Sequence, residues 1–142
     1  MQISNILAKK GSDVATIGPD QTIREALALL VGKRIGALVV VDEAGKVVGL
    51  LSERDIIREA AQNEALFSQL VGHIMTKDVI VARPGDDLHA VEQTMTVKRF
   101  RHLPIMDHGE LIGIVSIGDV VKAALDESEG VIETLESRVE KG

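Results

Sequence analysis

The chain contains an internal repeat, in which residues 14–61 match residues 79–125 with a gap of one residue. Four pairs of identical residues lie 65 positions apart: Pro19 and Pro84, Arg34 and Arg99, Leu38 and Leu103, and Asp42 and Asp107. Beyond a turn that is one residue shorter in the second copy, three further pairs lie 64 apart: Gly49 and Gly113, Ser52 and Ser116, and Asp55 and Asp119. A unit of about 60 residues is small for a core of its own. We therefore expect the two copies to pack on each other about a pseudo-twofold axis.

Each copy follows the order strand, helix, strand, strand, helix, which predicts an α+β fold. A short strand over residues 14–17 precedes a helix that Thr22 begins as N-cap, with Glu25 completing a capping box. The apolar residues of this helix recur at helical spacing and predict one buried stripe: Ile23, Ala26, Leu27, Leu30 and Val31. Uninterrupted apolar runs at 37–41 and 103–106 predict strands that are covered on both faces.

Additional segments precede and follow the two copies. Short leader segments, residues 3–7 and 71–75, come before each copy. After Asp119 the apolar residues continue at helical spacing through residues 120–125, and then at Ile132, Leu135 and Val139. On a monomer this stripe would be exposed to water, which favours a homodimer. A tail that folds back onto its own chain is the alternative.

Composition and charge exclude several classes of function. The absence of cysteine removes disulfides, thiol nucleophiles and thiolate metal sites. With a net charge of −6, two Phe and no Trp or Tyr, the chain has neither a basic surface for duplexes nor stacking side chains for single strands, so we expect no nucleic-acid partner. No apolar run approaches the roughly 20 residues of a membrane span, and the amino-terminal residues lack the apolar core of a signal peptide. We expect a cytoplasmic protein with no membrane contact.

The polar residues form no catalytic or metal-binding pattern. The four histidines are scattered over different predicted elements, and none has a second histidine four residues away. The sequence contains no glycine-rich phosphate loop, and no nucleophile is paired with a base. We therefore expect neither a bound metal nor an enzyme.

The most informative motif ends each copy. Residues 49–55 read Gly-Leu-Leu-Ser-Glu-Arg-Asp, and residues 113–119 read Gly-Ile-Val-Ser-Ile-Gly-Asp. In both, a serine and an aspartate three residues apart stand where a predicted strand passes into a helix, which is typical of a helix cap. The same groups suit a sugar, because a carboxylate accepts two hydrogen bonds from a vicinal diol and nearby helix amides can meet phosphate. Taken alone, the motif favours the cap.

The two-copy layout, the Gly-x-x-Ser-x-x-Asp motif at the end of each copy and the sequence Arg-His-Leu-Pro-Ile at 101–105 resemble a pair of CBS domains. This is the small repeat first named in cystathionine β-synthase. The resemblance is to stand-alone bacterial proteins, and it implies two tandem β-α-β-β-α repeats, at residues 1–68 and 69–125, that form one module. Residues 126–142 would form an acidic helical tail.

The resemblance also implies a function. Family members are regulatory modules that bind adenosine-containing ligands in two clefts between the repeats. The ligands are AMP, ADP or ATP, which makes some modules energy sensors, and in some members NAD or S-adenosylmethionine. No cofactor is obligatory. The resemblance further implies a homodimer shaped as a flat disc and a regulated partner protein that the sequence does not identify.

Residues of the two clefts follow from the same resemblance. In one cleft Ser116 and Asp119 hold the ribose, and the adenine lies against the first copy, at Thr16, Ile17, Gly36 and Ala37. In the other cleft Ser52 and Asp55 hold the ribose, and the adenine lies against Val79, Ile80, Val81 and Pro104.

Basic residues cluster at the start of the second apolar strand. Four cationic or potentially cationic groups lie within five residues: Lys98, Arg99, Arg101 and His102. They predict a local anion site, and the resemblance puts the ligand's phosphates at Arg101 and His102. The first copy has the uncharged Gly36 and Ala37 there, so the two clefts should not bind equally well. A solvated helix end is the alternative for the first two cluster residues, and Arg54 is a further candidate for a phosphate contact.

Two functions remain open. The first is regulation through an adenosine ligand bound between the copies. The second is an interaction scaffold, in which the motifs are only helix caps and the outer face or the acidic tail recruits another protein. An enzyme acting on a nucleotide ranks last, because no catalytic residues accompany the motifs.

Overall fold

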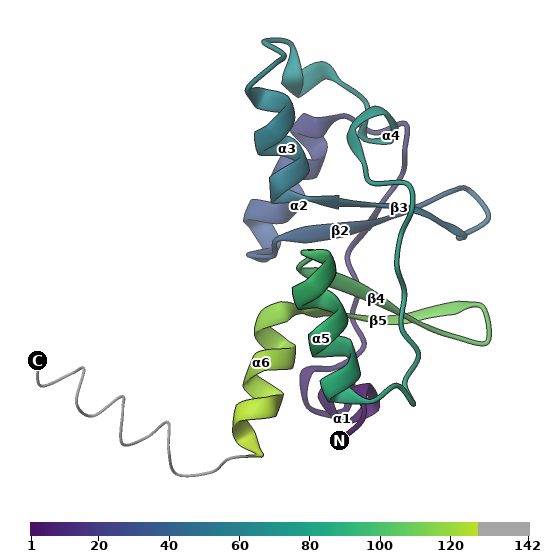
Figure 1. The fold of residues 1–142 in the computed structure, drawn as a ribbon. Helices are drawn as coiled ribbons and strands as arrows, with labels where there is room; N and C mark the ends of the chain where they lie inside the picture. Colours follow the sequence, from purple (N-terminus) through teal and green to yellow (C-terminus); the bar gives the residue numbers. More distant parts are fainter. Residues whose placement is uncertain (128–142) are drawn as a thin grey trace, which may run out of the picture.

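The computed structural model describes residues 1–127, which form two halves stacked one above the other (Figure 1). The elements in chain order are α1 (Ile3–Lys10), β1 (Thr16–Ile17), α2 (Ile23–Lys33), β2 (Ala37–Val41), β3 (Val47–Ser52), α3 (Glu53–Ala60), the short 3₁₀ helix η1 (Leu66–Ser68), α4 (Val71–Ile74), α5 (Leu88–Lys98), β4 (His102–Asp107), β5 (Glu110–Ser116) and α6 (Ile117–Asp126). In the first half β1 pairs parallel and β3 antiparallel with β2, and in the second half β4 and β5 form an antiparallel pair. The predicted α+β fold is confirmed, with a first strand shorter than expected.

The first strand of the second copy is reduced to a single bridge. In the first copy the Val39 N–H on β2 donates to the Ala15 carbonyl at 3.2 Å, next to the β1–β2 pairing. The matching residue in the second copy is Pro104, which has no N–H to donate. A bridge between Ala82 and Ile105 is what remains there. The predicted five-element order is therefore complete in the first copy and lacks a full first strand in the second.

The helices begin at the predicted capping residues. The Thr22 hydroxyl accepts from the Glu25 N–H, and the Glu25 carboxylate accepts from the Thr22 N–H, both at 3.3 Å. Of the predicted stripe, α2 buries Ile23, Ala26 and Leu30. Val31 was expected there as well but is 75% exposed. It lies about 80° around the helix from Ile23, at the edge of the stripe.

Two buried clusters, one in each half, form the hydrophobic interior. The cluster of the first half combines the first copy with the second leader: Ile17, Ile23, Ala26, Leu30, Leu38, Val40, Leu51, Ile56, Leu66 and Val71. The cluster of the second half combines the second copy with the first leader: Ile3, Ile6, Ala82, Leu88, Val91, Met95, Leu103, Ile105, Val115 and Val120. Val39 lies in neither cluster and is also fully buried. This confirms that β2 is covered on both faces.

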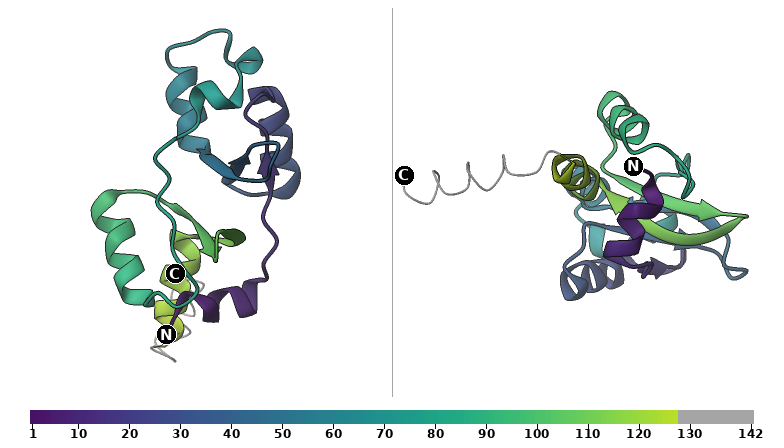
Figure 2. Two further views of the ribbon diagram at one scale, coloured as in Figure 1. Left: turned by 90° about the vertical axis from the view of Figure 1, so that its right-hand side faces the viewer. Right: turned by 90° about the horizontal axis from the view of Figure 1, so that it is seen from below.

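The two leader segments are exchanged between the halves. The first leader, in α1, packs on the second copy, where the Ile3 N–H donates to the Asp86 carbonyl at 3.0 Å. The second leader, in α4, packs on the first copy, where the Gly72 N–H donates to the Pro19 carbonyl at 2.8 Å. Figure 2 shows α1 in purple beside the second half, with the following chain crossing to the first half. Each half therefore completes its core with the leader of the other copy.

Two glycines allow the leaders to lie close to the sheets. Gly49 on β3 lies against Met75, and a Cβ at Gly49 would also come within 3.0 Å of the Thr76 carbonyl oxygen. Gly113 is the matching position on β5, and a Cβ there would lie 2.6 Å from Leu7 Cδ2. The glycine that opens each repeated motif therefore makes room for a leader.

Helix α6 carries the start of the apolar stripe that is expected to continue into the tail. Val120 is buried in the second core, while Val121 and Leu125 are exposed. Ile57, the residue of the first copy that matches Val121, is exposed too. The later residues of the stripe, Ile132, Leu135 and Val139, lie outside the described residues, and the homodimer stays a prediction. Within residues 1–127, no helix has both the length and the apolar character needed to cross a membrane.

Replacing Gly49 with alanine is expected to lower the free energy of unfolding by about 1–3 kcal/mol, the usual cost of overpacking a core. The added methyl group meets both Met75 and the backbone of Thr76. Gly32→Ala on α2 is the control, because nothing lies within 4 Å of a Cβ at that position, and alanine should stabilise the helix by up to about 1 kcal/mol. Urea denaturation of both variants measures the two effects. A Gly49→Ala variant as stable as the wild type would contradict the tight fit of the leader.

Candidate functional site

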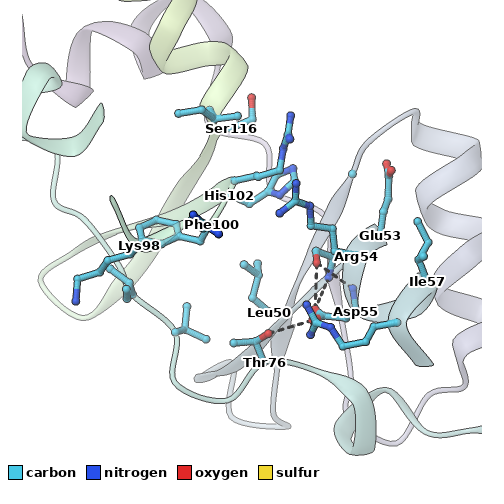
Figure 3. A pocket seen from close by; sticks show the side chains of 18 of the residues that line it. Leu50, Glu53, Arg54, Asp55, Ile57, Thr76, Lys98, Phe100, His102 and Ser116 are labelled. Carbon is cyan, nitrogen blue, oxygen red and sulfur yellow. Dashed lines mark hydrogen bonds and ion pairs between the residues drawn. The ribbon is translucent and has the colours of Figure 1, made fainter. Parts of the chain in front are cut away.

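A cavity of about 810 Å³ lies between the two halves of the molecule. Its lining residues come from the end of β3, the start of α3, residues 76–80, the end of α5 and the start of α6. Cavities of this volume hold small molecules of nucleotide size. We call it the Asp55 cleft, because Asp55 and Thr76 face each other at one end of it (Figure 3).

Asp55 combines the geometry of a helix cap with a position on the wall of the cleft. The Asp55 N–H donates to Ser52 Oγ at 3.3 Å, and the Ser52 N–H donates to Asp55 Oδ2 at 2.9 Å, which completes the predicted cap of α3. The Thr76 hydroxyl donates to Asp55 Oδ1 at 3.3 Å, and Arg58 Nη1 lies 3.7 Å from the same oxygen. A carboxylate offers about four lone-pair positions. The cap therefore uses one oxygen and leaves acceptor capacity on the other.

Positive charge exceeds negative charge on the walls of the Asp55 cleft. Five lining side chains are cationic at neutral pH: Arg54, Arg58, Lys98, Arg99 and Arg101. The lining carboxylates are Glu53, Asp55 and Asp78. Arg54 belongs to the first half and Lys98 to the second, so an anion in the cleft meets cations from both sides (Figure 3). An excess of cations in a cleft attracts anions and raises their local concentration.

His102 lies half-buried at the start of β4, where the two halves meet. Gly36 of the first half lies against it, and a Cβ at Gly36 would be 3.2 Å from His102 Nε2. Burial lowers the pKa of His102 below its ordinary value of 6.5, although the carboxylate of Glu53 opposes the shift. The positive charges of Arg101 and Lys10 lower this pKa further. The imidazole is therefore neutral at pH 7.

Asp119 repeats the cap of Asp55 at the start of α6 but has a different neighbour. The Ser116 N–H donates to Asp119 Oδ2 at 2.8 Å, and the Asp119 N–H donates to Ser116 Oγ at 3.1 Å. Lys10 is the last residue of α1. Its ammonium group donates a hydrogen bond to the same Oδ2 at 2.6 Å and another to the Ile114 carbonyl at 2.8 Å. Partial burial raises the pKa of Asp119, but the hydrogen bonds from Lys10 and Ser116 outweigh it and hold this pKa below its ordinary value of 3.8.

Most residues predicted for the two sites gather in the Asp55 cleft. Ten of them line it: Gly36, Ser52, Arg54, Asp55, Val79, Ile80, Lys98, Arg101, His102 and Ser116. Six are not among its lining residues: Thr16, Ile17, Ala37, Val81, Pro104 and Asp119. Gly36 and Ser116, which the resemblance assigned to the other cleft, border this one. Ile17, Ala37 and Pro104 are buried, and their contacts with adenine stay predictions.

The leaders bring two residues to the motifs that the sequence patterns did not indicate. Thr76 directly follows the second leader and reaches Asp55, and Lys10 follows the first leader and reaches Asp119. The repeat of the leaders does not reveal these two contacts, because the alignment of 3–7 with 71–75 pairs Thr76 with Ala8 and Lys10 with Asp78.

Comparison with known proteins identifies relatives over most of the chain. The CBS domain matches it twice, at residues 4–62 and 71–126. The CBS domain-containing protein YhcV of Bacillus subtilis is 35% identical over 130 residues, which are 90% of this chain and 91% of YhcV. Some relatives are longer: an uncharacterized protein of Methanocaldococcus jannaschii is 34% identical over 78% of this chain, which spans 39% of that protein.

Solved structures of the same kind share the fold. A CBS-domain containing protein of Agrobacterium tumefaciens is similar with a TM-score of 0.83 and 43% identity, over 87% of this chain and 92% of that chain. The protein CBSX2, solved in complex with AMP, has a TM-score of 0.70 and 31% identity, over 82% and 90% of the two chains. A CBS domain pair solved with 5′-methylthioadenosine and S-adenosyl-L-methionine has a TM-score of 0.80 and 27% identity, over 89% of this chain and 98% of that chain.

Lowering the pH is expected to destabilise the protein through His102. Because the pKa of His102 is lower in the folded protein than its ordinary value of 6.5, the unfolded chain binds more protons as the pH falls below that value, and stability is lost. His102→Gln removes this titration. Its free energy of unfolding, measured by urea denaturation, should fall less than that of the wild type between about pH 7.5 and pH 5.5.

The control for this measurement is His73→Gln. His73 is exposed on the short helix α4, and its side chain makes no hydrogen bond or ion pair with the residues that the structure describes. This variant should keep the pH dependence of the wild type. Asp119 does not interfere, because its lowered pKa lies below 3.8, outside the range of the experiment. Equal losses of stability in His102→Gln and the wild type would show that burial of His102 does not govern the effect.

Proposed function

This chain belongs to the CBS-domain family, and we propose that it is a regulatory module whose Asp55 cleft binds an adenosine-containing ligand. AMP, ADP and ATP are the first candidates, and NAD and S-adenosylmethionine are further ones. One observation carries the proposal: a single cavity between the halves combines a capping carboxylate that suits a sugar diol with a surplus of cations. The relatives solved with AMP, or with 5′-methylthioadenosine and S-adenosyl-L-methionine, support the adenosine part of the proposal.

The ribose hydroxyls bind to Asp55 in this proposal. The hydrogen bond from the Thr76 hydroxyl to Asp55 Oδ1 is 3.3 Å, which is long for an O–H···O bond, so a ligand hydroxyl replaces or joins it at low cost. Asp55 Oδ2 keeps the cap of α3 by accepting from the Ser52 N–H, and it also accepts from the Ser52 hydroxyl at 3.1 Å. Rotation of that hydroxyl frees a lone pair of Oδ2 for the second hydroxyl of a vicinal diol. Asp55 is only 8% exposed, so these bonds form largely out of water, where they are stronger.

The adenine lies against the apolar part of the cleft. Leu50, Val79 and Ile80 line it, and Ile80 is exposed. With two Phe and no Trp or Tyr in the chain, the base packs between aliphatic side chains. Recognition of adenine then depends on hydrogen bonds to backbone groups of these segments, since aliphatic packing does not distinguish one purine from another.

The phosphates of a nucleotide lie towards Arg101 and His102. Arg101 supplies a permanent positive charge and His102 a neutral imidazole that can donate one hydrogen bond. Ligands that lack phosphate, such as S-adenosylmethionine, gain nothing from Arg101. The cations of the cleft therefore favour AMP, ADP and ATP within the adenosine class.

Regulation requires that the ligand favour one arrangement of the protein over another, because equal affinity for two arrangements shifts neither. A ligand in the Asp55 cleft contacts α3 of the first half and residues 98–102 of the second half. It therefore stabilises one relative placement of the halves, which a second copy of the chain or a regulated partner protein can detect.

An interaction scaffold without a ligand is the second candidate function. One observation favours it: Ser52 with Asp55, and Ser116 with Asp119, form complete capping boxes from their own side chains and backbone N–H groups. Helix capping then accounts fully for the serine and the aspartate of each motif. In that case no adenosine compound changes the stability of the protein.

AMP at saturation is expected to raise the thermal midpoint, and Asp55→Asn is expected to abolish most of the rise. Ligand at ~100 times its Kd adds roughly 2.7 kcal/mol to stability, which is roughly 5–10 °C for a chain of this size. Asparagine keeps an oxygen for the cap but has a donor group in place of the second oxygen, so the cap survives and the diol contact does not.

The control variant for Asp55→Asn is Asp87→Asn. Asp87 caps α5 by accepting from the Ala90 N–H and does not line the cleft, so the midpoint should rise as in the wild type. A wild-type midpoint that no adenosine compound moves would contradict the regulatory proposal and support the scaffold.

Arg101→Gln is expected to weaken AMP binding about tenfold while adenosine binding stays unchanged, because the proposal gives Arg101 a contact with phosphate alone. The carbonyl of Arg101 accepts from the Ile117 N–H at 2.8 Å, and this bond does not depend on the side chain. Arg83→Gln changes an exposed arginine that does not line the cleft and is the control. Calorimetric titration with both compounds measures the difference. An equal loss for AMP and adenosine would disprove the phosphate contact.

A further inference from the structure

We propose that Lys10 occupies the sugar-binding position of Asp119, so that each chain holds one adenosine ligand, in the Asp55 cleft, instead of two. Lys10 thereby selects which of the two repeated motifs takes the ligand of the function proposed above, on which this assignment rests. Asp55 and Asp119 are equivalent under the pseudo-twofold symmetry, and each caps its helix through the serine three residues before it. The groups that the leaders bring to them are not equivalent.

The carboxylate of Asp55 accepts from a neutral hydroxyl and lies 3.7 Å from the exposed Arg58 Nη1, whereas that of Asp119 is hydrogen-bonded directly to a cation. Thr76 donates to Asp55 Oδ1 at 3.3 Å, a long and weak bond. Lys10 donates to Asp119 Oδ2 at 2.6 Å, a short charge-assisted bond. Asp119 Oδ2 also accepts from the Ser116 N–H, so one oxygen carries both the cap and the ammonium. A ribose diol that bridges both oxygens has to displace the ammonium.

Equivalent positions just after the two leaders carry side chains of opposite charge. Leu7 and Met75 are equivalent, because they pack against the equivalent glycines Gly113 and Gly49. Three residues further on, the first leader has Lys10 where the second has an aspartate, Asp78. The repeated scaffold therefore holds residues of opposite charge at matching positions of the two leaders.

A second hydrogen bond fixes Lys10 at this position. Helix α4 ends at Ile74, and the extended Thr76 pairs with Leu50 through bonds of 2.9 and 3.0 Å. Helix α1 continues to Lys10, and the carbonyl of Ile114, the equivalent of Leu50, accepts from the Lys10 ammonium at 2.8 Å. The ammonium thus takes the place of a backbone N–H and is held between two acceptors.

Neutral sugar hydroxyls compete poorly for a carboxylate that is already paired with a held cation. The Asp119 side chain is 28% exposed, so the pair is partly shielded from water. Removing the ammonium leaves the Asp119 carboxylate, like that of Asp55, without a hydrogen bond from a cation, since Arg58 Nη1 lies 3.7 Å from Asp55 Oδ1. The affinity of the Asp119 position for a ribose should then rise about tenfold or more, the usual effect of one hydrogen bond to a charged group.

Calorimetric titration with AMP tests the assignment through the number of ligands bound per chain. The wild type should bind one, and Lys10→Met, which keeps the length of the side chain without its charge, should bind two. Lys10→Arg keeps a cation at this position and should bind one. Lys9→Met, a change at the adjacent residue of α1, is the matched control and should also bind one. Thermal denaturation without AMP confirms that each variant is folded.

The double variant Lys10→Met with Asp55→Asn locates the new site, because its remaining binding must come from Asp119. A wild type that binds two AMP, or a folded Lys10→Met that binds one as the wild type does, overturns the role of Lys10 and leaves the Asp55 cleft intact. A wild type that binds none while Lys10→Met binds one supports the role of Lys10 and overturns the proposed function of the Asp55 cleft. No binding to either protein overturns both.

Discussion

The exchange of leader segments is the constraint on which the rest of the structure depends. Neither copy completes its interior alone: α1 fills the core of the second half, and α4 fills that of the first. The crossing chain holds the halves together, so the cavity between them has a defined shape. The same exchange delivers Thr76 to Asp55 and Lys10 to Asp119. The leaders therefore set both the stability of the module and the difference between its two motifs.

The fold was largely predictable from sequence because its determinants are local. The capping pair Thr22 and Glu25, and the serine–aspartate pairs of the motifs, act within one helical turn, and the structure has all three caps. Two departures have local causes as well. Pro104 withholds the N–H that Val39 donates at the matching position, and Val31 lies at the edge of its helical stripe. What the pattern did not contain was the partner of each leader, which is a contact across most of the chain.

The candidate site was predictable in its residues but only partly in their grouping. Ser52, Asp55 and the basic cluster at 98–102 were marked by motif and charge, and the structure places them around one cavity. The repeat suggested two similar sites, and its symmetry concealed the difference that Lys10 makes at Asp119. The lowered pKa of His102 was also beyond sequence patterns, since it arises chiefly from burial between the halves. Both effects depend on contacts between distant segments.

The arrangement of the two cores has a consequence for the order in which the protein is built on the ribosome. The first core uses residues 17–71, a continuous stretch that can close as soon as it has emerged. The second core joins Ile3 and Ile6 to residues as late as Val120. Helix α1 is therefore synthesised before the first core and docks only when residues as late as Val120 are available. Until then its apolar face is exposed to water, where chaperones can bind it.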